Sequence, residues 1–230
     1  FFRKAIETLT ARNPNPIDGE PFYNLGLSLM FKGDQEAAYE AFYNSAWNAA
    51  WMDKAYFQLA RLDAYNKQWD KALEHINRSL THNWHNHKAR QLKVSILRFL
   101  KEIDAAVDLC EDSLALDHFN YSVYYEMYLL TAKNDYLEQM EKLLNDNIHS
   151  YIEYSFDYAY SGLYREALEM IVTGISGKEH VYPLALYLKA WLESKLGDKV
   201  SSDETLKRAA DESPDYCFPN QPEAVILLKW

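Results

Sequence analysis

Four histidines lie close together in the sequence around Trp84, and histidine is a common zinc ligand. They are His75, His82, His85 and His87. A transition-metal site needs neutral imidazoles that converge on one ion, with partners that orient each ring. No carboxylate or thiolate stands at a recognised ligand spacing from them. Three of the four fall where a turn is expected, and polar side chains commonly cap helices at such turns. We therefore expect a structural cluster without a bound metal; stoichiometric zinc, lost when His82, His85 and His87 are mutated, would contradict this.

Catalytic motifs are missing from the sequence. It holds no GxSxG, no Walker loop, no HExxH and no glycine-rich phosphate turn. Asp and Glu pairs are plentiful, but on exposed helices such pairs solubilise the surface far more often than they act as acid–base dyads. We expect a protein that is not an enzyme and needs no cofactor.

Two tryptophans one helical turn apart, Trp47 and Trp51, flank Asn48-Ala49-Ala50. Indoles at this spacing can share one face of a helix, as a sugar-stacking platform would require. The pair also falls where a helix is expected to end, and large rings at such places wedge neighbouring helices together. We favour the wedge, and the sugar platform is the alternative.

Composition and charge exclude several classes of function. The 230 residues carry a net charge of −10, and such a surface repels the phosphate backbone of nucleic acids. No apolar run reaches the length of about 20 residues that a membrane span needs. Only 7 Gly and 7 Pro are present, few for a turn-rich β fold. Cys110 and Cys217 form no disulfide framework or CxxC motif, and Cys110 falls on an apolar helix face as a small core residue. We expect a helical protein that binds neither nucleic acid nor membrane.

A period of 34 residues organises the chain. A small, a large and a second small residue recur three times at the same offsets, without a gap: Ala38, Phe42 and Ser45; Ala72, Ile76 and Ser79; Ala106, Cys110 and Ser113. The alanines let a second helix approach closely, and the residue four positions later fills the space beside it. A period of this length indicates stacked helical hairpins.

The helix that precedes the first of these triplets completes the pattern. It reads Phe22-x-x-Leu25-Gly26-x-x-Leu29, with Gly33 in the following turn. Together with Ala38 and Phe42, these residues resemble the tetratricopeptide repeat, which reads W-x-x-L-G-x-x-Y, then A-x-x-x-F, then P. The resemblance is strong for 19–52 and 53–86. It is weaker for 87–120, where Arg90, Lys93 and Val94 stand at the apolar positions.

The resemblance implies an all-α fold, a right-handed superhelix (α-solenoid) of about five to six tetratricopeptide-type helical hairpins. Residues 1–230 are predicted to form a single array, with repeats at 19–52, 53–86, 87–120, a shortened 121–147, 148–181 and 183–216. Partial units are expected at both ends. Prolines in the stretch Asn13-Pro14-Asn15-Pro16 are predicted to separate the first partial unit from the first full repeat.

A closer resemblance rests on short stretches of sequence. They are Arg12-Asn13-Pro14-Asn15-Pro16 with Gly19-Glu20-Pro21-Phe22-Tyr23-Asn24-Leu25-Gly26, then Trp47-Asn48-Ala49-Ala50-Trp51, Asn86-His87-Lys88-Ala89-Arg90 and Asp215-Tyr216-Cys217-Phe218-Pro219. They are similar to the C-terminal repeat region of large bacterial proteins, in which a β-sandwich similar to galactose mutarotases precedes the repeats. The resemblance implies that this chain is a fragment of a larger protein and that any carbohydrate chemistry belongs to the upstream portion.

In tetratricopeptide arrays the first helix of each hairpin faces the concave side, and the resemblance transfers this arrangement to one row of residues. The candidate partner-binding residues in this concave groove are Tyr23, Lys54, Phe57, Arg61, Tyr65, Lys88, Gln91, Arg98 and Tyr125. Arg and Tyr dominate binding hot spots. The alternative is a solvated face with scattered aromatics. Chaperone-binding members clamp a peptide C-terminus with Lys and Asn at two places where this chain has Tyr23 and Leu27, so that activity is not predicted.

These observations predict a non-catalytic scaffold that binds a protein or peptide in the concave groove. The alternative is an accessory repeat region of a larger bacterial carbohydrate-related protein, which packs on an upstream domain of the same polypeptide. If the groove charges are exposed, replacing Arg61 and Arg98 with alanine should weaken partner capture with little loss of stability, because exposed charges contribute little to folding.

Overall fold

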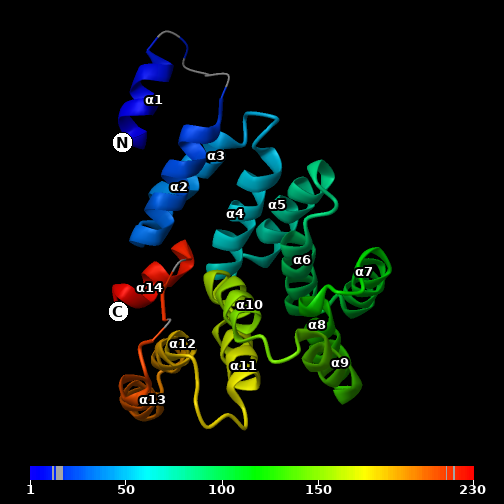
Figure 1. Ribbon diagram of the computed structural model, residues 1–230. Coiled ribbons are helices and arrows are strands. Elements are labelled where there is room, and N and C mark those ends of the chain that lie inside the picture. Colours follow the sequence, from blue (N-terminus) through cyan, green and yellow to red (C-terminus); the bar gives the residue numbers. More distant parts are fainter. Residues whose placement is uncertain (12, 14–17, 216, 220) are drawn as a thin grey trace. The chain divides into compact units, whose positions relative to one another are not determined.

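Pairs of helices follow one another along the chain in the computed structural model (Figure 1). It describes residues 1–11, 13, 18–215, 217–219 and 221–230, and this part of the chain contains no strand. Arg12, residues 14–16 of the predicted proline break and Tyr216 lie outside the described residues. The all-α fold of helical hairpins is confirmed.

Six hairpins occupy the described residues. They are α2 (Glu20–Lys32) with α3 (Gln35–Ser45), α4 (Met52–Tyr65) with α5 (Trp69–His82), α6 (His87–Leu100) with α7 (Ile103–Leu116), α8 (Tyr121–Thr131) with α9 (Asn134–Leu144), α10 (Ile148–Tyr160) with α11 (Tyr164–Ile175), and α12 (Pro183–Lys195) with α13 (Lys199–Asp211). Helix α1 (Phe2–Thr10) precedes them, and a 3₁₀ turn (Pro222–Ala224) and α14 (Val225–Leu228) follow.

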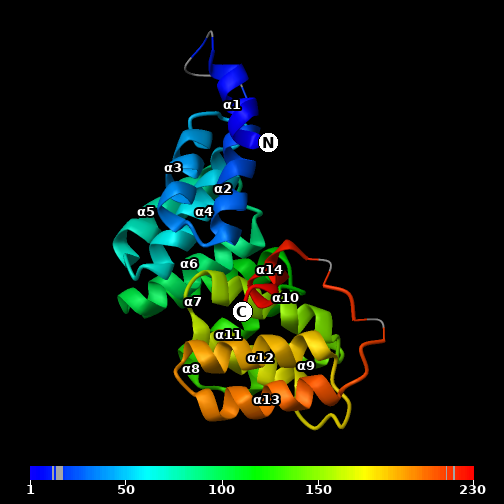
Figure 2. The ribbon, with the colours of Figure 1, turned by 90° about the vertical axis from the view of Figure 1, so that its left-hand side faces the viewer.

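The helices form two compact units, unit 1 (Phe1–Leu137) and unit 2 (Glu138–Trp230). The boundary falls within α9, inside the predicted shortened repeat 121–147. In unit 2, α12 and α13 lie side by side (Figure 2). The Tyr160 hydroxyl donates to the carbonyl of Glu223 at 2.7 Å and so connects α10 to the C-terminal turn of this unit.

A residue in the left-handed backbone conformation closes every one of these hairpins. In the first three turns it is Gly33, Lys67 and Lys101, at φ of 92°, 59° and 66°, which stand 34 residues apart. The backbone N–H of the left-handed residue donates to one of the last carbonyls of the preceding helix and so ends that helix. Glycine adopts the left-handed conformation without strain. The turn therefore repeats with the same period as the helices, although two of the three positions are lysine.

The repeated triplets of the second helices are fully buried. Ala38, Ala72 and Ala106 are 0% exposed, as are the large residues that follow each of them. The serines have a further role: Ser45 donates to the carbonyl of Gly19 at 3.0 Å, and Ser79 donates to the carbonyl of Asp53 at 2.7 Å. Each of these bonds spans 26 residues and joins the end of a second helix to the start of the first helix of the same hairpin.

Replacing Ala72 with leucine should lower the free energy of unfolding by about 1–3 kcal/mol, because added methylenes overpack a filled core. Ala72 belongs to the buried cluster that includes Ile76, Leu80 and Ile96. Urea denaturation of the full chain measures the effect, and Ala115→Leu, at an exposed position of α7, is the control. Equal midpoints for A72L and wild type would contradict the assigned packing.

Gly26 shows how closely the two helices of the first hairpin approach. A Cβ atom at this position would lie 2.6 Å from ring carbons of Phe42, which is itself fully buried. The glycine predicted from the repeat pattern is therefore required by contact with the aromatic residue of the second helix.

The third hairpin accommodates a cation where the first two have aromatic rings. Arg90 is fully buried; its Nε donates to Ser113 Oγ at 2.8 Å, and its guanidinium lies 4.2 Å from the ring centroid of Trp84. Burial lowers the pKa of this guanidinium. The repeat pattern is thus weaker in 87–120 because of a local substitution, and the hairpin geometry is the same.

Candidate functional site

The nine residues predicted for the concave groove all lie on first helices of unit 1. Tyr23 is on α2, Lys54, Phe57, Arg61 and Tyr65 are on α4, Lys88, Gln91 and Arg98 are on α6, and Tyr125 is on α8. We call this row the first-helix strip.

Polar contacts join neighbouring first helices along the strip. The Gln58 amide donates to the Tyr23 hydroxyl at 3.4 Å, and the Gln91 amide donates to Glu126 at 3.4 Å. Each pair is separated by 35 residues, one repeat plus one position. Glu126 also accepts from Ser95 Oγ at 2.5 Å and from Arg98 Nε at 3.0 Å. These side chains link one hairpin to the next.

The expectation that Arg61 and Arg98 are exposed is wrong. Arg61 is 5% exposed, and Arg98 forms an ion pair with Glu126, whose side chain is 0% exposed. Phe57, Gln91 and Tyr125 are also buried. Gln91 and Arg98 bond to Glu126 on the neighbouring first helix, α8, and Arg61 bonds to Gln58 on its own helix. The periodicity of a single repeat does not reveal these contacts. Of the nine residues, Lys54 and Lys88 are exposed and Tyr23, Tyr65 and Arg98 are half-buried.

The tryptophan pair divides into two environments. The Trp51 ring lies 5.1 Å from the Tyr23 ring, and its indole nitrogen donates to Asp18 at 3.2 Å, so Trp51 joins the first two hairpins as a wedge. Trp47 is 67% exposed. A wedge function therefore fits Trp51, and Trp47 presents its ring to solvent.

The histidine cluster is dispersed in the structure. His75 Nδ1 donates to Asp63 at 2.6 Å in the interior of unit 1. His87 is the first residue of α6, and its ring nitrogens lie 3.1 Å from the Asn120 amide and 3.6 Å from Asp117. Within the described ranges, no group of three or more His, Cys, Asp or Glu side chains is placed to hold a metal ion. None of the described helices combines the length and the apolar character needed to cross a bilayer.

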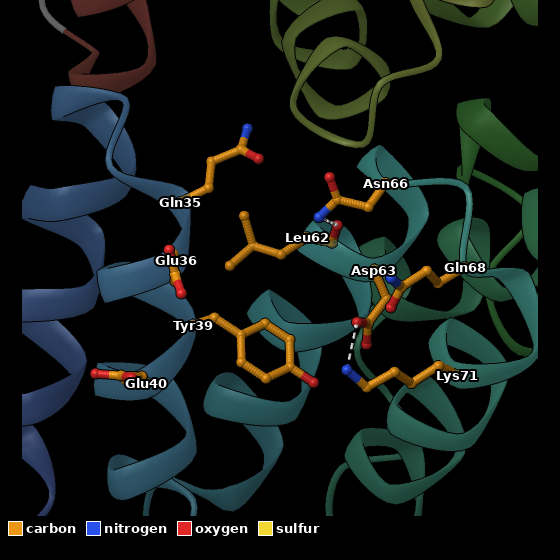
Figure 3. A pocket seen from close by; sticks show the side chains of 9 residues that line it. All are labelled: Gln35, Glu36, Tyr39, Glu40, Leu62, Asp63, Asn66, Gln68 and Lys71. Carbon is orange, nitrogen blue, oxygen red and sulfur yellow. Dashed lines mark hydrogen bonds and ion pairs between the residues drawn. The ribbon is translucent and has the colours of Figure 1, made fainter.

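A pocket of about 610 Å³ opens where α3, α4 and α5 meet in unit 1 (Figure 3). One wall is α3 and the opposite wall is the end of α4 with the start of α5. The lining residues are Gln35, Glu36, Tyr39, Glu40, Leu62, Asp63, Asn66, Gln68 and Lys71. Its size falls within the range of about 300–1,000 Å³ that is usual for binding pockets.

The floor of this pocket is an ordered polar cluster. Asp63 is 2% exposed and pairs with His75 on one oxygen and with the Lys71 ammonium, 3.4 Å away, on the other. The same ammonium lies 4.5 Å from the ring centroid of Tyr39. Burial raises the pKa of the Tyr39 hydroxyl, and the hydrogen bond with Tyr39 raises the pKa of Lys71. At neutral pH the Tyr39 phenol is thus neutral and Lys71 is an ammonium.

Two acidic residues central to these networks were missed by sequence reasoning. Asp63 lies in the run Leu59-Ala60-Arg61-Leu62-Asp63-Ala64, and Glu126 follows the predicted Tyr125 directly. A carboxylate inside an otherwise apolar helix is seldom buried without a partner, and this signal could have identified both.

Comparison with known proteins supports the fold. No family model and no curated protein sequence matches the chain. Among solved structures, a tetratricopeptide repeat protein from Parabacteroides merdae ATCC 43184 aligns over 99% of this chain and 91% of its own, with 17% identity and a TM-score of 0.54. A chain of the APC/C hetero-tetramer Cut9-Hcn1 aligns over 99% of this chain and 45% of its own, with 14% identity and a TM-score of 0.53. The chain has a tetratricopeptide-repeat-like fold.

Proposed function

We propose that the chain is a non-catalytic scaffold that binds a protein or peptide segment along the exposed part of its first-helix strip. The observation that carries this proposal is the pair Lys54 and Lys88, which are exposed in the first turns of α4 and α6 and stand 34 residues apart. Each is near an indole in the sequence, and the Lys54 ammonium lies 4.7 Å from the Trp51 ring.

Cations that recur at the repeat spacing suit an extended partner, because successive partner residues meet equivalent groups on successive hairpins. The polar contacts between first helices fix the spacing of these groups before binding, and such preorganisation lowers the entropic cost of association. The solved chain of the Cut9-Hcn1 hetero-tetramer belongs to an assembly. We extend partner binding to this chain as part of the proposal.

The upstream β-sandwich of the same polypeptide stays a prediction, which the gene sequence before residue 1 tests.

Site-specific cross-linking tests the proposal. Benzoylphenylalanine at Lys54 or Lys88 should cross-link a defined protein in extract of the native host. The same probe at Asn77 or Glu111, exposed positions on the second helices α5 and α7, should not. Cross-links from the second helices alone would contradict binding along the first-helix strip, and mass spectrometry of the adducts identifies the partner.

A further inference from the structure

The pocket between α3, α4 and α5 already holds a cation of its own chain. The Lys71 side chain is 47% exposed, and its ammonium reaches from solvent to the buried Asp63 carboxylate and the face of Tyr39. A carboxylate below and an aromatic face beside the ammonium are the two groups that favour a cation most. We call this arrangement the cation seat.

The charge of the remaining lining also favours a cation. The lining contains three carboxylates, Glu36, Glu40 and Asp63, and one ammonium, so its net charge is negative even with Lys71 in place. Figure 3 shows Glu36 on α3 next to Tyr39, whereas the Glu40 carboxylate points away from Lys71. The whole chain is acidic as well, with a net charge of −10. A fixed field of this sign attracts cationic groups and repels anionic ones.

We propose that this pocket binds a cationic side chain, arginine above all, that a partner protein inserts onto the cation seat in place of Lys71. The proposal rests on the proposed scaffold function and names the chemistry of one contact that the partner makes. The amides of Gln35, Asn66 and Gln68 supply hydrogen-bonding groups at the rim for the backbone of the inserted segment.

Lys71 can be displaced because half-exposed ion pairs are weak. A guanidinium matches the seat better than an ammonium does, since it donates two parallel hydrogen bonds to a carboxylate and stacks on an aromatic face. Removal of Lys71 should therefore open the seat and strengthen binding. If the pocket instead used Lys71 to bind a carboxylate, the same change would abolish binding, so one variant separates the two readings.

The test uses the full chain and a defined probe, the peptide acetyl-Gly-Ser-Arg-Ser-Gly-amide, followed by backbone amide shifts in NMR. The matched peptide carries citrulline, which keeps the shape of arginine and loses its charge. We expect the arginine peptide to shift pocket residues and Lys71→Ala to tighten its binding by about fivefold, the equivalent of one weak ion pair. Lys207→Ala makes the same change in net charge on α13 and should leave the affinity unchanged.

Glu36→Gln should weaken binding by about threefold, as the loss of a nearby unlike charge predicts, whereas the matched neutralisation Glu111→Gln on α7 should not. Equal shifts by the citrulline peptide, or weaker binding to K71A than to wild type, would overturn the proposal. Spermidine that shifts the same residues at lower concentrations than the peptide would assign the seat to a free polyamine and overturn it too. Each of these results leaves the scaffold function standing, because that is measured by cross-linking at Lys54 and Lys88.

Discussion

Replacing Arg98 with alanine should lower the free energy of unfolding by about 3–5 kcal/mol, the usual cost of removing one partner of a buried ion pair. The Arg98 guanidinium on α6 bonds to Glu126 on α8 at 3.0 Å, and the Glu126 side chain is fully buried. The variant removes the cation that α6 supplies and keeps the charge of the carboxylate in a poorly solvated place. Urea denaturation of the full chain measures the loss.

Arg78→Ala is the matched control for R98A. Arg78 pairs with Glu74 at 2.6 Å, but both side chains are more than half exposed, so the expected loss is small. Glu126→Gln added to R98A should recover part of the stability, because it removes the buried charge. Similar small losses in R98A and R78A would contradict the structural role of Arg98 and restore the view that it is a surface charge of the groove.

Replacing His75 with phenylalanine should lower the free energy of unfolding by about 3 kcal/mol, because it deprives a buried carboxylate of a charge-assisted hydrogen bond. His75 donates to Asp63 at 2.6 Å, and its ring stacks on Tyr56 with centroids 5.6 Å apart. Phenylalanine keeps a ring of similar shape against Tyr56, so the loss reports mainly on the bond to Asp63. Thermal and urea denaturation measure it.

A double-mutant cycle makes this assignment specific. Asp63→Asn in the H75F background should restore stability relative to H75F, and the two single changes should couple by at least about 1 kcal/mol, as contacting residues do. His87→Phe is the control, since His87 lies 3.6 Å from Asp117 with both side chains well exposed. Additive effects of H75F and D63N, or equal losses in H75F and H87F, would contradict the stabilising hydrogen bond between His75 and Asp63 in the pocket.

The hairpins and their period follow from the residue types alone. Ala38, Ala72 and Ala106 mark places where two helices touch, and only a small residue permits that distance, so the requirement is visible in the residue type. The same holds for Gly26 against Phe42. Cys110 is a further example, because the prediction that it is a small core residue is confirmed by its full burial.

The partners of the polar side chains in the first-helix strip depend on how the helices pack in three dimensions. Tyr23 meets Gln58 and Gln91 meets Glu126 across 35 residues, and Arg98 meets Glu126 across 28. A helical period places such residues on one face, but it does not determine whether a long side chain extends into solvent or bonds to the next helix. That choice depends on rotamers and on the chemistry of residues a repeat away. The cation seat has the same origin, since Tyr39, Asp63 and Lys71 come from three helices whose packing alone brings them together.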